Sequence, residues 1–472
     1  MRTRKEVDTN GLNDIDANRG MTRLDRTRSA MRFLEFPLIC TGLITCFPGC
    51  TDRGIEPPLP QSPLTLAVED VGVTEAWLRL GLSAEATPRK VDLKYNGLVI
   101  TSLTLTTSDT VIVLDSLLPN QKYHFTCFRA IDATRCDSAS VWLTTMDTTS
   151  HNFTWEIDTL GQAASSVLYD VAIISDTLAY AVGEIFVRDS LGGIDPTPYS
   201  LAKWNGTGWQ LMRMYYSSNG SPQVIAPIRG IAVLESQDFW FAAGSVFHWD
   251  GHSAFADLSF SRLELPEPNG TLEKIRGTSR ASLCAVGNAG SIIRLAGTAW
   301  SKLESGTTLP VQDIWVGPRH ANSTESICLA SAFQANQGEE LLLLGANSAD
   351  KLPTSGLAWR LSGLWFVPDR LYIVVGDGVF VKRSIKDIST WQNLAPEVTQ
   401  YYVSAVAGTG LNDVVAVGHF GEVLHFNGVS WRSLLPETAI DGAYLRVAVR
   451  QQLSMAVGFA KSNAVVLRGL HR

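Results

Sequence analysis

The chain has 472 residues, of which 45% are hydrophobic and 18% are charged, so it can build packed cores and is not a wholly disordered protein. At roughly 100–200 residues per domain, this length predicts two to four domains. The formal net charge of −7 argues against a nucleic-acid-binding protein. The sequence has no run of 18 or more uncharged apolar residues, so we expect no transmembrane helix.

Residues 31–50 have the physical order of an export signal. A basic flank comes first, an apolar run follows, and the small residue Gly49 stands directly before Cys50. This order resembles a bacterial lipoprotein signal, although the Phe-Pro pair before Gly49 departs from the family's pattern. The resemblance implies that Cys50 becomes the lipid-modified first residue of the mature protein. An ordinary cleaved signal with incidental cysteines is the alternative.

The segments on either side of this signal are expected to lie outside any folded domain. Residues 1–30 are polar and lack apolar periodicity, so they are either disordered or a mis-assigned start, with Met21 and Met31 as alternative first residues. Residues 51–62 contain three prolines between positions 57 and 60, which favours an extended tether. Such a tether would hold the following domains away from a membrane, and an interdomain linker would adopt the same conformation.

Residues 63–147 contain short segments in which apolar and polar side chains alternate, as they do in half-buried strands. Asn-Gly and Pro-Asn pairs provide turns between these segments. The pattern predicts an antiparallel sandwich. The spacing Leu-x-Pro-x-x-x-Tyr from Leu117 to Tyr123 resembles the tyrosine corner of fibronectin type III domains, and Trp77 would be the core aromatic residue of such a domain.

The cysteines of the folded region allow one disulfide bond. Cys127 and Cys136 flank a predicted hairpin, and an exported protein is oxidised where a bond between them would persist. Two free thiols are the alternative. Cys284 and Cys328 are isolated in the sequence, and Cys284 is expected to be a buried small residue. No CxxC pair and no Cys/His cluster is present, so we propose no metal site.

A repeat extends from about residue 151 to residue 472. Seven apolar segments, each expected to be the second strand of a unit, end in a glycine: Gly183, Gly244, Gly287, Gly345, Gly376, Gly418 and Gly458. A further apolar strand lies about twelve residues before most of them, and several units end in Gly-x-x-Trp. A sheet of three or four such strands cannot bury both of its faces alone. Radial stacking of the sheets would bury them, which predicts a β-propeller.

The ends of the repeat predict how the propeller closes. Residues 151–160 form a Trp-bearing strand without a unit of its own, whereas the last unit lacks its Trp strand. We therefore expect residues 151–160 to complete the last blade and to remove the exposed edges of a propeller over 151–472. The repeat predicts seven blades. Six or eight remain open because the fourth unit is irregular.

The order of lipoprotein signal, fibronectin-like segment and Ala-Val-Gly and Asn-Gly-x-Ser-Trp repeats resembles envelope propeller proteins of Bacteroidetes-like bacteria. The resemblance implies an all-β architecture, with an immunoglobulin-like fibronectin type III sandwich followed by a seven-bladed β-propeller. It also implies an outer-membrane lipoprotein of the bacterial cell envelope, facing the periplasm or exposed at the surface. It implies no activity.

The sequence offers little chemistry. It contains no zinc-protease, serine-hydrolase, phosphate-binding, dinucleotide-binding or EF-hand motif, and we expect no cofactor and no metal. The acidic residues beside predicted strands are interpreted as turn caps, and they are Asp170, Asp313 and Asp413.

Long insertions are better indicators of a site, because in repeat folds they gather on one functional face. The insertion after Gly183 ends at Tyr199, and a second long connection holds Tyr215 and Tyr216. These three tyrosines could stack on a sugar or anchor a partner protein. Solvated loops without a ligand are the alternative.

Two classes of function follow. The first is a non-enzymatic exported lipoprotein, monomeric and attached to the membrane only by its lipid. Its propeller would bind an envelope protein or an extracellular glycan, and the fibronectin-like domain would be a spacer. The alternative is a propeller glycoside hydrolase or polysaccharide lyase. The hydrolase would need two carboxylates about 5–10 Å apart at the channel mouth. We favour the first.

Overall fold

The computed structural model describes residues 64–471, except 84–88, 131–135, 163–164, 236, 266–268, 320–324 and 359. The segments predicted over residues 1–62, including the lipidation site Cys50, lie outside these residues. The described part is almost entirely β-structure and contains three short helices: α1 (Leu435–Thr438) and the 3-10 helices η2 (Arg262–Glu264) and η3 (Arg280–Ser282). None of the helices in this part is long and apolar enough to cross a membrane.

Residues 64–144 form two antiparallel sheets that share one core. The first has the order β1-β2-β5 (Leu64–Val71, Ala76–Leu82, Asp109–Leu114). The second has the order β4-β3-β6-β7 (Leu98–Leu105, Arg89–Tyr95, Lys122–Ala130, Cys136–Thr144). Because side chains alternate between the faces of a strand, apolar residues such as Leu78, Leu93 and Phe125 all point into this core.

Tyr123 fixes the entry to β6. Its phenolic oxygen accepts a hydrogen bond from the backbone N–H of Leu118 at 2.8 Å. Its ring lies beside Tyr95 and stacks on Phe125, with ring centroids 5.4 and 5.8 Å apart. The loop before β6 is therefore tied to a buried aromatic group.

The predicted disulfide between Cys127 and Cys136 is not formed, and both cysteines are free thiols. The register of β6 and β7 pairs Cys127 with Ala139 and Cys136 with Ala130. Cys127 is buried and Cys136 is exposed, because the two positions fall on opposite faces of the sheet. Burial raises the pKa of the Cys127 thiol to about 12.

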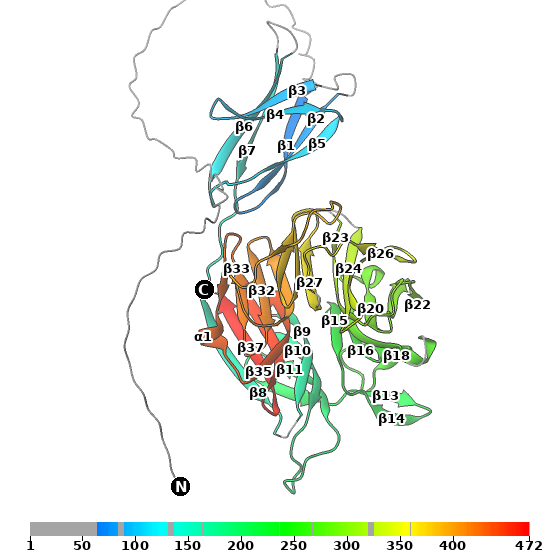
Figure 1. The fold of residues 1–472 in the computed structure, drawn as a ribbon. Helices are drawn as coiled ribbons and strands as arrows, with labels where there is room; N and C mark the ends of the chain where they lie inside the picture. Colours follow the sequence, from blue (N-terminus) through cyan, green and yellow to red (C-terminus); the bar gives the residue numbers. More distant parts are fainter. Residues whose placement is uncertain are drawn as a thin grey trace, which may run out of the picture. The chain divides into compact units, whose positions relative to one another are not determined.

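The described residues between 153 and 471 form a β-propeller, in which seven four-stranded antiparallel sheets surround a common axis (Figure 1). We call the space enclosed by their innermost strands, into which buried polar side chains point, the channel. We name each sheet by its innermost strand. The first three are β9-β10-β11-β12 (Val167–Ser175, Leu178–Ile185, Tyr199–Trp204, Trp209–Met212), β15-β16-β17-β18 (Gly230–Glu235, Asp238–Ala243, Ser245–Trp249, Asp257–Phe260) and β19-β20-β21-β22 (Thr271–Arg276, Cys284–Asn288, Ile292–Ala296, Ala299–Lys302).

The next three sheets are β23-β24-β25-β26 (Val311–Pro318, Ser326–Gln334, Gly338–Leu344, Ala349–Leu352), β27-β28-β29-β30 (Leu361–Val367, Leu371–Gly376, Gly378–Lys382, Gln392–Asn393) and β31-β32-β33-β34 (Val403–Gly410, Asp413–Gly418, Val423–Phe426, Trp431–Ser433). The last is β35-β36-β37-β8 (Gly442–Arg450, Leu453–Ala460, Asn463–His471, Phe153–Leu160). A separate hairpin, β13-β14 (Tyr215–Ser218, Ser221–Val224), lies in the connection between the first two sheets.

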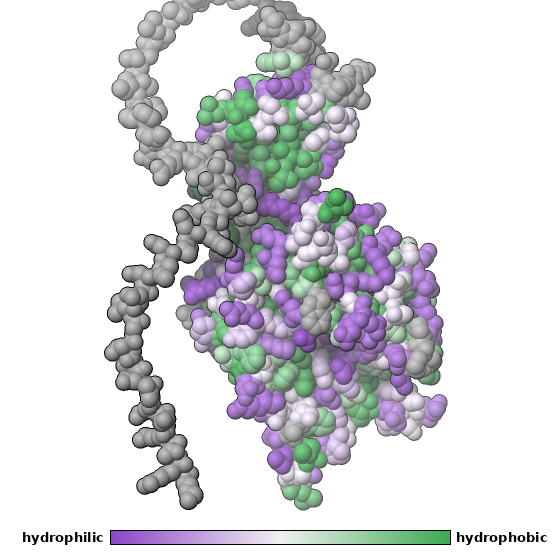
Figure 2. Space-filling view, viewed as in Figure 1, coloured by the Kyte–Doolittle hydropathy of each residue, from purple (hydrophilic) through white to green (hydrophobic). Residues whose placement is uncertain are grey.

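The innermost strands form a closed ring. Each contacts the next in chain order from β9 to β35, and β35 contacts β9. The β35 sheet joins distant parts of the chain, because β8 pairs with β37 from Ala464 opposite Leu160 to His471 opposite Phe153. Apolar clusters fill the space between neighbouring sheets, so each sheet buries its faces against the next. On the face shown in Figure 2, hydrophilic and hydrophobic residues are interspersed.

In five of the propeller sheets, the same local geometry explains why the second strand carries a glycine. In five sheets, the glycine of the second strand pairs with a residue of the first strand, and the next residue of the first strand has no pairing partner. The first strand therefore bulges at this point. These first strands are β9, β19, β27, β31 and β35. A Cβ atom on the glycine would overlap with a carbonyl oxygen at the start of that first strand. The glycines are Gly183, Gly287, Gly376, Gly418 and Gly458. These positions require glycine because the backbone of the first strand approaches them closely, and not because they have a left-handed conformation.

Described residues of the sandwich and of the propeller belong to one compact unit. Arg370, in the turn between β27 and β28, donates hydrogen bonds to Asp70 and Glu69 of β1 at 2.8 and 3.0 Å. Its guanidinium also lies 4.5 Å from the centre of the Trp77 ring. Trp77 lies between Ala76 and Leu78, which point into the sandwich core, and is not part of that core itself. Its buried ring faces Arg370 of the propeller instead, so the prediction of Trp77 as the core aromatic residue was wrong.

Candidate functional site

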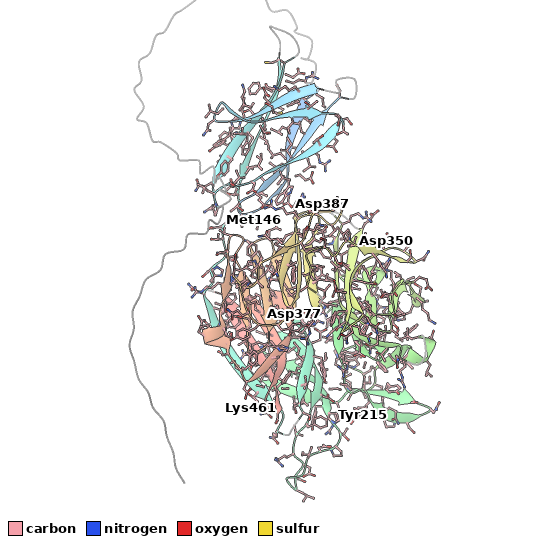
Figure 3. All side chains as sticks on the ribbon, viewed as in Figure 1. Met146, Tyr215, Asp350, Asp377, Asp387 and Lys461 are labelled. Carbon is pink, nitrogen blue, oxygen red and sulfur yellow. The ribbon has the colours of Figure 1, made fainter. Side chains whose placement is uncertain are left out.

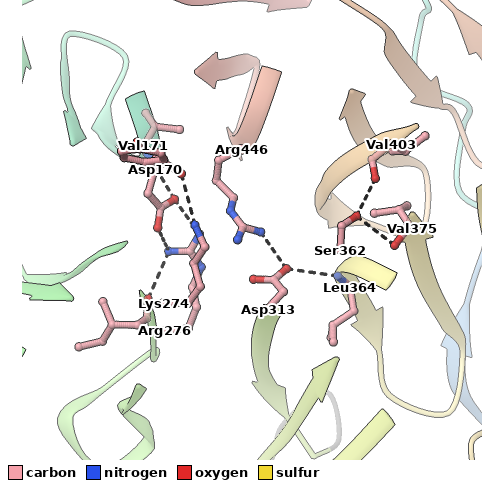
Figure 4. Close-up of polar contacts among 12 residues, drawn as sticks. Asp170, Val171, Lys274, Arg276, Asp313, Ser362, Leu364, Val375, Val403 and Arg446 are labelled. Carbon is pink, nitrogen blue, oxygen red and sulfur yellow. Dashed lines mark hydrogen bonds and ion pairs between the residues drawn. The ribbon is translucent and has the colours of Figure 1, made fainter. Parts of the chain in front are cut away.

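The channel contains two ion pairs between sheets that are not neighbours (Figure 4). Arg276 of β19 donates two hydrogen bonds to Asp170 of β9, at 2.9 and 3.0 Å. Arg446 of β35 binds Asp313 of β23 at 3.0 Å. Both carboxylates and Arg446 are buried. Because the two pairs cross the channel, they connect four of the sheets that form its wall.

The two carboxylates also bind backbone groups. Asp170 accepts hydrogen bonds from the N–H groups of Val171 and Ile231 at 2.9 and 3.2 Å, and Asp313 accepts one from Leu364 at 3.2 Å. Burial opposes ionisation of Asp170 and is the largest single effect on it, but the charges of Arg276, Lys274 and Arg446 together outweigh it and hold the pKa of this carboxyl below its usual value. Asp170 and Asp313 are therefore channel residues, and their interpretation as turn caps was wrong.

Lys274 of β19 is the third cation of the channel. Its ammonium donates hydrogen bonds to the backbone carbonyls of Arg229 at 3.2 Å and Tyr169 at 3.4 Å. Burial, helped by the charge of Arg446, lowers the pKa of Lys274 to about 7. A lysine in this environment changes its charge near neutral pH.

A cavity of about 350 Å³ lies beside Lys274. Its polar lining includes Tyr169, Arg229, Glu273, Asn288 and Gln312. Arg229 forms an ion pair with Glu273 at 3.0 Å, and its guanidinium lies 4.6 Å from the centre of the Tyr169 ring. The cavity therefore has one balanced ion pair at its wall and one lysine without a bound carboxylate.

A second feature is an aromatic cluster formed by the connection that leads into β31 and by the turn between β32 and β33. We call Tyr401, Tyr402, His419 and Phe420 the aromatic shelf. The rings of Tyr401 and Phe420 are 5.3 Å apart, and these residues are 38% and 57% exposed. The ring of Tyr402 lies 5.0 Å from His419 and 4.6 Å from the guanidinium of Arg360. The shelf thus presents two exposed rings beside a cation.

Phe420 has an unusual backbone conformation. Its φ is 60°, in the left-handed region that bulky residues rarely adopt. The corresponding turn of the β19 sheet, two residues after Gly287, has the small residue Ala289 with φ 52°. Two hydrogen bonds hold Phe420 in place: its N–H donates to Gly442 at 2.8 Å, and its carbonyl accepts from Ile440 at 3.2 Å.

Buried polar groups support the shelf from below. The carboxylate of Glu422, which is 2% exposed, accepts a hydrogen bond from the hydroxyl of Thr399 at 2.6 Å. The same hydroxyl accepts the N–H of Tyr401 at 3.1 Å. The N–H of His419 donates to the carbonyl of Tyr402 at 3.0 Å. The two segments that carry the rings are therefore fixed to each other.

The three tyrosines predicted as ligand contacts lie in two places. Tyr199 begins β11, packs against the core between the β9 and β35 sheets, and has the Arg213 guanidinium 4.1 Å from its ring centre. Tyr215 and Tyr216 begin the β13-β14 hairpin (Figure 3). Tyr216 packs near Phe247 in a different core cluster, with ring centroids 5.1 Å apart. All three are partly buried, and none of them lines the cavity or the shelf.

Three histidines meet where the ends of the propeller join. His151 and His425 are in contact through their Nδ1 atoms at 2.8 Å, and His471 stacks on Phe153. Asp413 lies beside the β31–β32 turn, 3.3 Å from His425. Within the residues that the structure describes, no group of three or more His, Cys, Asp or Glu side chains could hold a metal ion.

Sequence reasoning missed both the shelf and Lys274. Phe420 could have been found by aligning the units, because it replaces a small residue in an otherwise equivalent turn. Lys274 gave no signal, because only the bulge of β19 and the ring of sheets direct it toward the cavity.

Comparison with known proteins identifies no family. No family model and no curated protein matches the chain. Similar solved structures include YCF48 from Cyanidioschyzon merolae (14% identity, TM-score 0.44) and the WD40 β-propeller domain of Doa1 (12%, 0.48). The computationally designed Ika8 protein is another (15%, 0.42). Each alignment covers 66–68% of this chain and 98% of the other. At these identities and scores the matches carry no argument about function.

Proposed function

We propose that this chain is an exported lipoprotein, anchored through Cys50, whose propeller binds a partner protein of the cell envelope. In this proposal residues 63–147 are a fibronectin type III domain that serves as a spacer, and residues 151–472 are a seven-bladed propeller. The strand orders β1-β2-β5 and β4-β3-β6-β7 and the Tyr123 hydrogen bond support the first assignment. The seven four-stranded sheets formed by the described residues between 153 and 471, and their closed ring, support the second.

The exposed ring of Phe420 in a left-handed conformation is the observation that carries the binding function. Such a conformation costs a bulky residue on the order of 1–3 kcal/mol. The turn itself does not require phenylalanine, since Ala289 serves in the equivalent turn. Folding gains little from a ring that is 57% exposed. A partner that covers Phe420 and Tyr401 would gain that apolar area.

The chemistry of the shelf favours a protein partner. Aromatic residues and arginine are the residue types that dominate protein–protein hot spots. Arg360 is exposed, stacks on Tyr402, and forms no ion pair within the residues that the structure describes. The best-matched partner segment therefore presents an apolar side chain next to a carboxylate.

Site-specific cross-linking in cells tests this function. A photo-reactive phenylalanine analogue at position 420 should cross-link to one discrete partner, and the same analogue at Lys461, on an exposed turn, should not. Arg360→Glu should reduce the cross-link at 420 at least fivefold. A cross-link of equal strength at both positions, or none at 420, would contradict the proposal.

Two further measurements separate the alternatives. Retention of the protein on a polysaccharide column, lost in Phe420→Ala, would indicate a glycan ligand in place of a protein. Release of reducing ends would indicate a hydrolase. The anchor is tested separately: Cys50→Ser should abolish labelling with radioactive palmitate and release the protein from the membrane fraction.

A further inference from the structure

The charges within the channel do not balance when Lys274 is protonated. Among the described residues the channel has three cations, Lys274, Arg276 and Arg446, and two carboxylates, Asp170 and Asp313. Arg276 and Arg446 bind the two carboxylates directly. One positive charge therefore remains, and it belongs to Lys274.

The surroundings of Lys274 do not neutralise it. Its two hydrogen bonds go to neutral backbone carbonyls, at 3.2 and 3.4 Å, and an ammonium has three N–H donors. Glu273, the carboxylate in the cavity wall, is paired with Arg229. Part of the Lys274 side chain is exposed, and it lines the cavity of about 350 Å³. A charge that is largely withdrawn from water is costly without a counterion.

We propose that this cavity binds a small monoanionic carboxylate, with the Lys274 ammonium as its counter-charge. A single negative charge matches the excess of one positive charge, whereas a dianion would exceed it. Asn288 and Gln312 each use one amide N–H, toward Thr271 at 2.8 Å and Phe333 at 3.1 Å. Each amide has a second N–H and a carbonyl oxygen for a polar ligand. A sugar acid or another short hydroxy acid fits this chemistry and this volume.

The site is independent of the aromatic shelf, and its affinity should depend on pH. Binding should weaken as the pH rises above about 7, because Lys274 then loses its proton. The groups that face Lys274 from the surrounding strands and connections are Tyr169, Asp170, Arg229, Glu273, Arg276, Asp313 and Arg446. Of these groups, Asp170 has a lowered pKa and Tyr169 and Arg276 have raised pKa values, so none of the three changes its charge between pH 6 and 8.5, and the change in affinity should follow Lys274.

Calorimetric titration of the purified protein tests the proposal. The probes are D-glucuronate and acetate, with glucose and inorganic phosphate as comparators, at pH 6.5 and 8.5. We expect at least one carboxylate to bind, tenfold more tightly at pH 6.5, while glucose does not bind. Lys274→Met should weaken binding at least tenfold. Lys461→Met, the same change on an exposed turn (Figure 3), should leave it unchanged.

A second measurement uses the unaltered protein, in case Lys274→Met fails to fold. Because a bound anion raises the pKa of Lys274, binding at pH 7.5 should take up protons. Titrations in buffers of different ionisation enthalpy measure that uptake. The proposal is overturned if neither carboxylate binds, if glucose or phosphate binds as tightly, if no proton is taken up, or if a folded Lys274→Met variant binds as well as the original.

Discussion

Glycine at the end of a second strand results from the shape of the neighbouring strand. At five of the seven predicted glycines, a Cβ atom would be too close to backbone atoms at the start of that strand. The structure shows that the crowding comes from a bulge in the first strand of the same sheet. The position of the glycine could be predicted from the repeat, but the cause could not, because a bulge has no fixed residue signature.

Gly287→Ala tests this explanation. The new methyl group would overlap with the carbonyl oxygen of Thr271, so the bulge of β19 would have to move. We expect the free energy of unfolding to fall by about 1–3 kcal/mol. Gly208→Ala is the control, since no atom lies within 4 Å of a Cβ at that position, and it should change stability by less than about 0.5 kcal/mol. Urea unfolding measures both variants, and equal losses would refute the explanation.

Lys274→Met tests the charge state of the channel through the pH dependence of stability. The pKa of Lys274 is lowered from 10.5 to about 7 in the folded protein, so the unfolded chain binds more protons between these values. Stability of the original protein should therefore rise with pH across this window, and that of the variant should rise less. The Tm of the variant minus the Tm of the original protein, both measured without ligand, should fall steadily from pH 6.5 to 9.5, because only the original protein gains stability from the loss of the Lys274 proton. A constant difference would mean that Lys274 is not perturbed.

The proximity of two buried cysteines is another feature at the residue scale that the sequence does not reveal. Cys284 and Cys328 are 44 positions apart, and no sequence motif connects them. In the structure both belong to the core between the β19 and β23 sheets, and Arg294 donates a hydrogen bond to the Cys284 sulfur at 3.4 Å. The hydrogen bond from the Cys328 thiol is the main reason that the pKa of Cys284 is lowered to about 7. Only the radial stacking of sheets brings these positions together.

At the scale of elements, the prediction of a β-propeller from the repeat was confirmed, because its evidence recurs in every unit. The strand of residues 153–160 pairs with β37, and the missing Trp strand of the last unit provided the reason to look there. The prediction of the disulfide was wrong, because only the register of β6 and β7 shows that Cys127 and Cys136 point to opposite faces of the sheet. The ligand-binding role of Tyr199, Tyr215 and Tyr216 stays a prediction, and loop length alone could not show that the three side chains lie in two separate places and are partly buried.

Truncation tests the role of β8. A chain that starts at Thr148 retains the strand, and a chain that starts at Gln162 exposes the edge of β37. We expect the first to remain a soluble monomer and the second to be less stable and to aggregate, because an unpaired edge is a template for other chains. Thermal unfolding and size-exclusion chromatography measure this. Equal stability of the two chains would show that β8 does not close the propeller.

At the scale of the molecule, the cross-channel ion pairs connect sheets that no apolar cluster of the described residues joins. Asp170 and Arg276 link the β9 and β19 sheets, and Asp313 and Arg446 link the β23 and β35 sheets. Such pairs contribute little relative to apolar replacements, but the loss of one partner leaves a buried charge.

Asp313→Asn should therefore lower the free energy of unfolding more than replacing both Asp313 and Arg446 with apolar residues does. We expect the single variant, which leaves Arg446 without its carboxylate, to lose about 3–5 kcal/mol of stability. The double variant Asp313→Leu/Arg446→Met should recover most of that loss. Urea unfolding of both proteins decides the point, and a double variant less stable than the single one would mean that the pair itself stabilises the ring.

The pairing of β8 with β37 also sets the order in which the propeller can form. Arg468 and Asp158, which bind each other at 2.8 Å, are 310 residues apart. The first sheets can pair as soon as they are synthesised, but the ring cannot close until residue 471 has emerged. Until then β8 is a strand without its partner, and contacts of such high sequence separation form slowly. We therefore expect β8 to stay unpaired until the last sheet is complete and ring closure to be the last step of folding.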